Sequence, residues 1–163
     1  MGALVEQALD MIEKDVPFEE ICKNTRWSAK HGTIYLTVSD LDNLVKGGRL
    51  NGAAAKLGDM LKIRPLLYVD QDGKVELLEK IRTDKRVNRR LAEIAVKDAE
   101  SFPNGMILKF AHTVDRERLD VAIESVHEKL PELEYEIGTL GPVIGTHTGI
   151  GTIGMATIPR ANY

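Results

Sequence analysis

The sequence predicts an α/β fold, in the α+β arrangement, with roughly six strands in a mixed sheet and about five helices. Strand-like and helix-like segments alternate along all 163 residues instead of grouping in separate halves. One strand–helix–strand unit is expected near residues 106–140. The length is that of one ordinary domain, or of one large piece of a two-domain protein.

The first 32 residues predict two helices. In the first helix an apolar stripe is expected to face the core, while Gln7 faces elsewhere. The second helix follows Pro17 and is expected to bury Phe18 together with Cys22, a small core residue rather than a reactive or ligating one. The stripe of the first helix consists of Leu4, Ala8, Met11 and Ile12.

Residues 33–39 alternate apolar and polar side chains, which predicts a half-buried strand. Ser39 or Asp40 is expected to cap a short helix that Gly47 and Gly48 end. The segment NGAAAKLGDMLKI (51–63) predicts a second short helix whose small side chains allow close approach of another backbone or a thin ligand.

The remaining segments predict a hairpin, two long helices and three further strands. The hairpin turns at Asp70 to Gly73, and a helix begins near Thr83. The last helix has amphipathic spacing between its apolar residues, Leu119, Ala122, Ile123, Val126 and Leu130. The three strands are expected at 106–114, around 133–139 and at 152–158.

Composition excludes several broad functions. With 43% apolar and 29% charged residues the chain is typical of a globular protein, and a net charge of -3 gives no general attraction to nucleic acid or anionic lipid. No apolar run reaches the ~18 residues of a membrane span. A single cysteine cannot form an internal disulfide, so the cytoplasm is the expected compartment. The histidines lack metal-ligand spacing, so no metal is expected.

The glycine-rich segment near the end of the chain raises the question of a nucleotide site. GIGTIG (149–154) matches the dinucleotide fingerprint formally, but that fingerprint requires a following helix and an acidic residue about 20 positions later. Only residues 155–163 follow, and they have strand character with Pro159 among them. The segment is therefore expected to be a glycine-rich turn, not a nucleotide cradle.

Two polar residues are candidates for holding an anion. His147 lies between Thr146 and Thr148 in the glycine-rich turn, where it either binds an anionic head group or hydrogen-bonds to the backbone. Arg49 follows two glycines and is either a surface cation or an anion holder. Of the other three histidines, His112 is expected to be a satisfied core residue, and His31 and His127 to be structural or exposed.

A basic run begins the predicted helix near Thr83. It is either a solvated helix face or a docking patch for an acidic or phosphate-carrying partner. No nucleophile–base arrangement is apparent, so the residues alone indicate a ligand-binding domain rather than an enzyme. The run consists of Arg82, Lys85, Arg86, Arg89 and Arg90.

Three segments together resemble the DegV family. Residues 37–86 carry an aspartate-leucine helix, a Gly-Gly-Arg turn, a small-residue helix and a strand pair that ends in Lys-x-Arg. GPVIGTHTGIGTIGMATI (141–158) resembles the family's C-terminal Gly-x-His-x-Gly-Pro-Gly segment, with Ile150 in place of the usual proline. Residues 3–21 resemble the helix pair that precedes the middle region.

The resemblance implies a protein that binds a long-chain fatty acid between two domains and performs no chemistry itself. Some family members present the carboxylate to the catalytic subunit of bacterial fatty acid kinase. On this basis, residues 1–32 are expected to join the two domains and residues 33–163 to form the C-terminal lipid-binding domain. The resemblance further implies that the N-terminal domain, with the family's carboxylate-holding Thr and Ser, lies outside this sequence. No cofactor other than bound fatty acid is implied.

The same resemblance implies roles for individual residues. His147, with Thr146, Thr148 and Arg49, is expected near the carboxylate, and Arg82, with Lys85 and Arg86, at the kinase-docking surface. A hypothetical tunnel for the acyl tail is lined by Ala53, Ala54, Leu57, Leu61, Ile63 and Leu66. Two alternatives stay open: an interaction or oligomerisation module without lipid binding, and a small enzyme that uses His147 as a general base.

Overall fold

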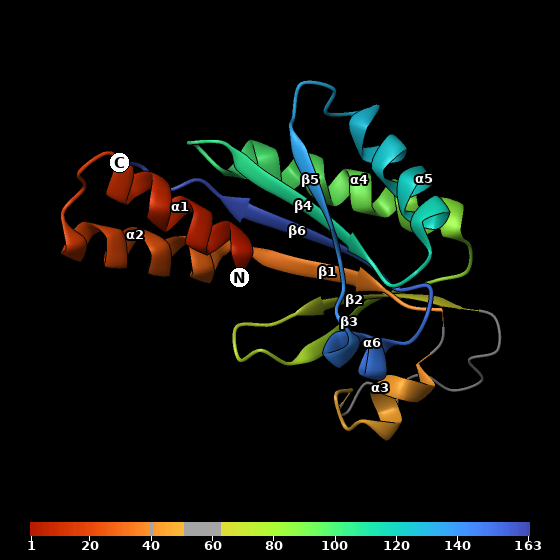
Figure 1. Cartoon of the computed structure of the whole chain (residues 1–163). Coiled ribbons are helices and arrows are strands. Elements are labelled where there is room, and N and C mark those ends of the chain that lie inside the picture. Colours follow the sequence, from red (N-terminus) through yellow and green to blue (C-terminus); the bar gives the residue numbers. More distant parts are fainter. Residues whose placement is uncertain (40, 51–62) are drawn as a thin grey trace.

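The computed structural model describes residues 1–39, 41–50 and 63–163 of the chain, and their elements form one six-stranded mixed sheet with six helices (Figure 1). The strand order is β3-β2-β1-β6-β4-β5. The strands are β1 (Thr33–Thr37), β2 (Arg64–Val69), β3 (Val75–Ile81), β4 (Met106–His112), β5 (Tyr135–Thr139) and β6 (Ile153–Pro159). The helices are α1 (Gly2–Glu13), α2 (Phe18–His31), α3 (Asp42–Lys46), α4 (Asp84–Ser101), α5 (Arg116–His127) and α6 (Pro142–Thr148).

The sheet is antiparallel except at one edge. β4 and β5 run parallel and are joined by α5, which is the predicted strand–helix–strand unit near residues 106–140. The predicted hairpin is also confirmed: β2 and β3 pair antiparallel, and Gly73 donates its backbone N–H to Asp70 at 3.0 Å with a positive φ of 79°. The α/β fold class predicted from the sequence is therefore confirmed.

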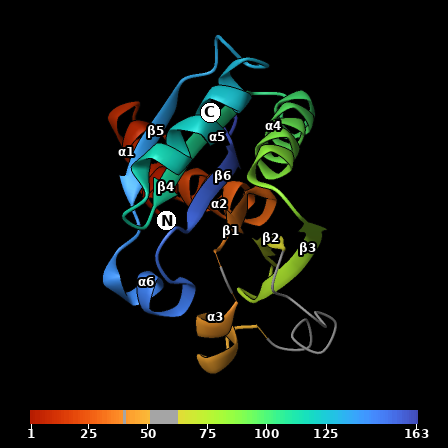
Figure 2. The same cartoon turned by 90° about the vertical axis from the view of Figure 1, so that its right-hand side faces the viewer.

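Helices α4 and α5 cover one face of the sheet, and the main core lies beneath them (Figure 2). α4 begins after Thr83 as expected, because the Thr83 side chain accepts a hydrogen bond from the backbone of Arg86 at 3.3 Å. Phe110 of β4 is completely enclosed between the sheet and the two helices, at 2% exposure. The other buried residues of this core include Leu91, Leu119, Ile123, Ile153 and Met155.

The described helices cover the opposite face of the sheet at its two ends (Figure 1). At one end α1 and α2 pack beside the end of β6, and Lys109 of β4 forms ion pairs with Glu6 of α1 and Glu136 of β5. Burial lowers the pKa of Lys109, but its hydrogen bonds to Glu136 and Glu6 outweigh burial and raise the pKa overall. At the other end α3 lies over a second core cluster of Leu36, Val38, Leu41, Leu44, Leu50 and Leu67.

Two expectations about the N-terminal helices are wrong. Gln7 is 3% exposed, because its side-chain amide donates to Pro159 O at 3.3 Å and its carbonyl accepts from Ala161 N at 2.9 Å. Phe18 is 74% exposed and Ile12 57% exposed, so neither faces the core. Since α1 and α2 flank the sheet instead of lying between two layers, both helices keep apolar side chains at the surface.

Two further corrections concern α3 and α6. The N-terminal boundary residue of α3 is Leu41, without a side-chain cap, rather than Ser39 or the undescribed Asp40. His147 and its neighbouring threonines, expected in a glycine-rich turn, instead belong to helix α6. Pro142 occupies its first turn, and Thr146 donates its hydroxyl to Pro142 O at 2.8 Å. The helix ends where Gly149 adopts a positive φ of 78°.

Candidate functional site

The candidate site lies where α3 and α6 meet, beside the carboxyl ends of the parallel strands β4 and β5. In open α/β sheets with parallel strands, ligands bind preferentially beyond the carboxyl ends of those strands. A pocket of about 830 Å³ opens here, within the usual size range of small-molecule sites. Its walls include Asn43, His112, Val114, Thr139, Thr146 and Ile150.

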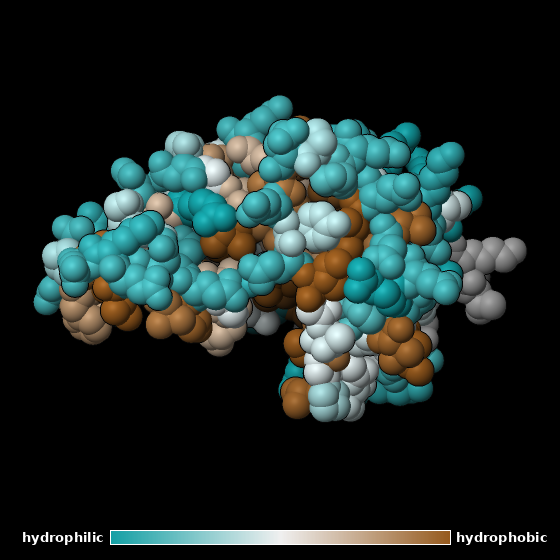
Figure 3. Space-filling view, turned by 45° about the horizontal axis from the view of Figure 1, so that its top comes forward, coloured by the Kyte–Doolittle hydropathy of each residue, from teal (hydrophilic) through white to brown (hydrophobic). Residues whose placement is uncertain are grey.

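The rim of this pocket is unusually apolar for an exposed surface. Val114 is 79% exposed and Ile150 74% exposed, and both line the pocket. Val143 of α6, next to the lining residue Pro142, is 78% exposed. Apolar patches are visible on the lobe that carries α3 and α6 (Figure 3). Clustered exposed aliphatic side chains around a pocket are typical of a binding surface.

Val114 is also conformationally strained. Its φ is 61°, in the left-handed region that β-branched residues rarely adopt. Thr113 anchors the backbone beside it: the Thr113 hydroxyl donates to Gly149 O at 2.8 Å and accepts from Thr152 N at 2.9 Å. A strained residue held at a pocket rim by its neighbours is a frequent feature of functional sites.

His112 is a polar group of the pocket that sequence reasoning misplaced. It lies opposite Thr139 in the β4–β5 ladder, and both residues line the pocket. Nδ1 of His112 is buried without a hydrogen-bond partner among the described residues, so the expectation of a satisfied core histidine is wrong. Buried polar atoms of this kind are rare and mark positions where a ligand or water completes the hydrogen bonding.

His147 and Arg49, the two predicted anion-holding residues, meet at Gly47. A Cβ on Gly47 would lie 2.5 Å from Nδ1 of His147, so the imidazole lies directly against the glycine backbone. Arg49 donates from Nη1 to Gly47 O at 3.0 Å and is otherwise exposed. His147 and Arg49 therefore both contact Gly47, and neither of them is among the residues that line the pocket.

The two threonines beside His147 point in different directions. Thr146 is exposed and lines the pocket. Thr148 is 6% exposed, with its hydroxyl donating to Ile144 O at 3.1 Å. Both hydroxyls donate within α6, Thr146 to Pro142 O at 2.8 Å, so the two residues differ in exposure at the pocket and not in their hydrogen bonding.

Most of the hypothetical tunnel lies outside the described residues, namely Ala53, Ala54, Leu57 and Leu61. Ile63 packs against the second core cluster on the α3 side of the sheet. Leu66 lies on the opposite face, completely buried in the main core beneath α4 and α5. The role of these six residues in a tunnel stays a prediction.

Around the start of α4, the predicted docking residues Arg82, Lys85 and Arg86 are all exposed. Among the described residues none of the three side chains forms an ion pair or hydrogen bond. Arg90, by contrast, pairs with Glu79 at 2.9 Å, and Arg89 with Glu93 at 3.5 Å. The basic run is therefore divided into a paired half and an unpaired half, and the unpaired half is available to a partner.

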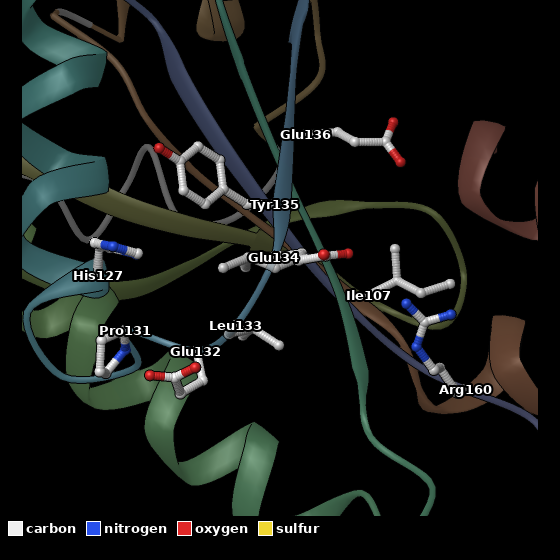
Figure 4. Close-up of a pocket in the computed structure, with 10 residues that line it drawn as sticks. Ile107, His127, Pro131, Glu132, Leu133, Glu134, Tyr135, Glu136 and Arg160 are labelled. Carbon is white, nitrogen blue, oxygen red and sulfur yellow. The ribbon is translucent and has the colours of Figure 1, made fainter.

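A smaller pocket of about 420 Å³ lies along the edge strand β5 (Figure 4). His127 and Tyr135 lie on one side of it, with Ile107 and Arg160 on the other. The His127 and Tyr135 rings make an edge contact with centroids 6.1 Å apart. His127 is exposed with its ring against Tyr135, and His31 is exposed with Nδ1 2.8 Å from Trp27 O, in agreement with the expectation that both are structural or exposed.

Within the part of the chain that the structure describes, no group of three or more His, Cys, Asp or Glu side chains is arranged to hold a metal ion. No helix among these residues is long and apolar enough to cross a membrane. The site consists of hydrogen-bond donors and acceptors beside aliphatic side chains. Such an arrangement can bind an amphipathic molecule.

Comparison with known proteins gives consistent matches along nearly the whole chain. A family model described as an uncharacterised protein of the DegV family matches residues 1–160. The DegV domain-containing protein YqaC of Lactococcus lactis is 37% identical over 164 residues, which cover 98% of this chain and 56% of that protein. The chain therefore spans little more than half the length of this curated relative.

Two solved structures share the fold. A protein described as a fatty acid binding DegV family protein from Streptococcus agalactiae is 29% identical with a TM-score of 0.88, covering 98% of this chain and 56% of that one. DegV from Bacillus subtilis, described as a fatty acid binding protein, is 32% identical with a TM-score of 0.80 and the same coverages, 98% and 56%.

Proposed function

Because the chain belongs to the DegV family, we propose that it binds a long-chain fatty acid as a carrier, with the carboxylate held where α3 meets α6. The observation that carries this proposal is the meeting of Arg49 and His147 at Gly47, next to a pocket of about 830 Å³ with an apolar rim. Donors for an anion and aliphatic surface for a tail are thus adjacent.

Each end of the ligand contributes differently to binding. A buried methylene is worth about 0.8 kcal/mol, so a long acyl tail provides on the order of 10 kcal/mol before an association cost of ~4–15 kcal/mol. The tail therefore drives affinity. The Arg49 guanidinium uses one of its donors on Gly47 O, which leaves others for a carboxylate, and His147 adds a hydrogen-bonding group from α6. The Thr146 hydroxyl can donate to the ligand only when it turns away from Pro142 O.

Calorimetric titration with palmitate and methyl palmitate tests the head-group assignment. The ester keeps the tail but loses the negative charge. We expect palmitate to bind at least tenfold more tightly, because hydrogen bonds to charged groups contribute ~1.5–3 kcal/mol. Equal affinity for the two ligands would show that no anion site exists at Arg49 and His147, and no binding of either would reject the carrier function for this chain.

In finer detail, we propose that the carrier presents its carboxylate to the catalytic subunit of a fatty acid kinase through Arg82, Lys85 and Arg86. Their lack of ion pairs among the described residues supports this, since unpaired exposed cations favour a partner of opposite charge. Arg82→Glu should weaken binding of that subunit and reduce its dependence on ionic strength. Arg26→Glu on α2 is the matched control, because Arg26 is also exposed and makes no described ion pair. Equal loss in both variants would contradict a specific docking surface.

The domain assignment is part of the same proposal. Residues 1–32 serve as the segment that joins two domains, and residues 33–163 form the lipid-binding domain. The longer relatives, of which the chain covers 56%, are consistent with a further domain that completes the site. Adding that domain in trans should increase fatty acid affinity, and an unchanged affinity would show that residues 33–163 contain the whole site.

A second candidate function is an interaction module that binds no lipid. It is favoured by one observation: α1 presents an apolar stripe to the surface, with Val5 52%, Leu9 53% and Ile12 57% exposed. Contiguous exposed stripes of this kind are typical of helix-docking surfaces. Sedimentation velocity distinguishes the two candidates, because this function requires self-association that Leu9→Glu abolishes, whereas the carrier function does not.

A further inference from the structure

The carboxylate of Asp84, in the first turn of α4, interacts with two arginines. Arg118 of α5 donates to Asp84 Oδ1 from Nε at 3.1 Å and from Nη2 at 2.7 Å. Arg64, at the start of β2, places Nε 3.5 Å from the same oxygen. The Arg118 side chain is only 13% exposed, so its charge is largely removed from water and depends on Asp84 for compensation.

Each arginine reaches a different loop beside the candidate site. Arg118 donates from Nη1 to the carbonyl of Gly151, in the turn between α6 and β6. Arg64 donates from Nη1 to Ser39 O at 3.2 Å, in the segment between β1 and α3. The two loops touch, because a Cβ on Gly151 would lie 2.4 Å from Ser39 Oγ. One carboxylate thus orients the groups that hold both loops.

These loops frame the pocket of about 830 Å³. Gly149 and Ile150 line it from one loop, and Asn43 lines it from α3, which follows the other loop. Asn43 Nδ2 would lie 2.8 Å from a Cβ on Gly149, so the two walls are in close contact. A shift of either loop therefore changes the shape of the pocket.

We propose that Asp84 is a positioning residue for ligand binding: through Arg118 it fixes the loop 149–152, and through Arg64 it fixes the backbone at Ser39, beside the pocket. The proposal rests on the proposed function, because it assigns Asp84 a role in fatty acid affinity without contact with the ligand. Removing the negative charge leaves two guanidinium groups facing the same uncharged position. Their mutual repulsion then separates the loops that they hold.

Hydrogen exchange of the loop 149–152 tests the positioning directly. Gly151 N donates to Thr113 O at 3.3 Å and Thr152 N donates to Thr113 Oγ1 at 2.9 Å, so both amides report on loop order. In Asp84→Asn we expect exchange of these amides to increase by about tenfold, while amides of β4 and β6 keep their protection. Asp84→Glu should restore part of the protection, because it keeps the charge.

Asp120→Asn is the matched control on α5. Asp120 pairs with Arg116 at 2.7 Å, but this pair is exposed, with side chains 51% and 53% accessible, and neither residue lines the pocket. Its loss should change neither loop exchange nor affinity. Fatty acid affinity should fall at least about fivefold in Asp84→Asn and stay unchanged in Asp120→Asn.

The two readouts separate this inference from the proposed function. If the wild-type chain binds no fatty acid, the proposed function fails, while loop exchange still decides whether Asp84 positions the loops. If the wild type binds fatty acid and Asp84→Asn binds it equally well with unchanged loop exchange, the positioning role is wrong. Loss of protection throughout β4 and β6 would show a general role in stability instead and would equally overturn the proposal.

Discussion

Gly47, the residue directly after α3, lies so close to His147 of α6 that no side chain fits between them. A Cβ at position 47 would be 2.5 Å from Nδ1 of the imidazole and 3.0 Å from Asn43 O. The φ of Gly47 is -77°, which any residue adopts, so the glycine is required by space and not by backbone conformation. The contact places the imidazole against the glycine whose carbonyl accepts from Arg49, and several predictions about fatty acid binding depend on it.

Gly47→Ala should displace the His147 ring and weaken fatty acid binding. Replacing glycine at a compatible φ stabilises a chain by about 0.4–1 kcal/mol through the unfolded state, which offsets part of the steric cost. We therefore expect a melting temperature close to that of the wild type but a clear loss of affinity in calorimetric titration. Gly138→Ala in β5 is the control, because its nearest neighbour would be 4.0 Å away. Equal affinity in the two variants would disprove the steric role of Gly47.

His147→Ala and Arg49→Ala should each reduce fatty acid affinity by about 10- to 100-fold. A hydrogen bond to a charged group is worth ~1.5–3 kcal/mol, and both side chains are assigned to one carboxylate. Arg49→Lys should give an intermediate value, since lysine keeps the charge but not the forked donors. His31→Ala on α2 controls for loss of an imidazole. If His147→Ala retains full affinity, the carboxylate is held at another position, with His112, which lines the pocket, as the next candidate.

Val114→Asn should make the protein more stable and lower its affinity for the fatty acid. Asparagine tolerates the left-handed conformation that costs L-residues roughly 1–2 kcal/mol, so a φ of 61° is less strained with it. A gain of about 1 kcal/mol corresponds to ~3 °C in melting temperature for a domain of this size. At the same time the pocket loses an aliphatic rim residue. Val121→Asn, at an exposed helical position on α5, should change neither quantity, and a stability loss in Val114→Asn would refute the strain.

The free energy of unfolding should fall between pH 10 and 12, in part because of Tyr35. Burial, followed by the charge of Asp98, raises the pKa of Tyr35 from 10.0 to about 12, and its hydroxyl donates to Asp98 Oδ2 at 3.3 Å. Below pH 10 the phenol is protonated in both states. Above pH 10 it deprotonates first in the unfolded chain, so stability is lost until the pH passes the folded pKa.

Urea unfolding of Tyr35→Phe across this pH range measures that contribution. The variant should lose less stability than the wild type between pH 10 and 12, because phenylalanine does not titrate. Tyr163, whose pKa burial and its hydrogen bond to Asp10 also raise to about 12, acts in the same window. The Tyr35→Phe/Tyr163→Phe double variant should therefore show the weakest pH dependence. Parallel curves for wild type and double variant would contradict both shifts.

Much of the fold was predictable because it depends on local patterns. The alternation of apolar and polar residues predicted β1, and the turn residues from Asp70 to Gly73 predicted the hairpin. Thr83 predicted the start of α4. Helix α6 was missed because glycine and threonine have low helix propensity; Pro142 in its first turn is the one local residue that favours a helix start. Gln7 was misplaced because its hydrogen-bond partner, Pro159, is 152 positions away in the chain.

The site could be predicted only in part, because contacts between residues that are distant in the sequence form much of it. His147 and Arg49 stood out beside glycines, and the structure brings them together at Gly47. His112 was assigned to the core because it continues the apolar face of a strand, but the strand ends there and the residue opens onto the pocket. No local sequence pattern indicated the pairing of Asp84 with Arg118, because the two residues are 34 positions apart and lie on different helices.

Mass spectrometry of an organic extract from the purified, denatured chain tests the central claim most directly. The protein is purified from cells without added lipid, and the extract is quantified against the protein concentration, with the His147→Ala/Arg49→Ala variant processed in parallel. If the chain is a fatty acid carrier, the wild type contains close to one equivalent of long-chain fatty acid, and the variant contains much less. An extract without fatty acid, or equal amounts in both proteins, would contradict binding of a carboxylate where α3 meets α6.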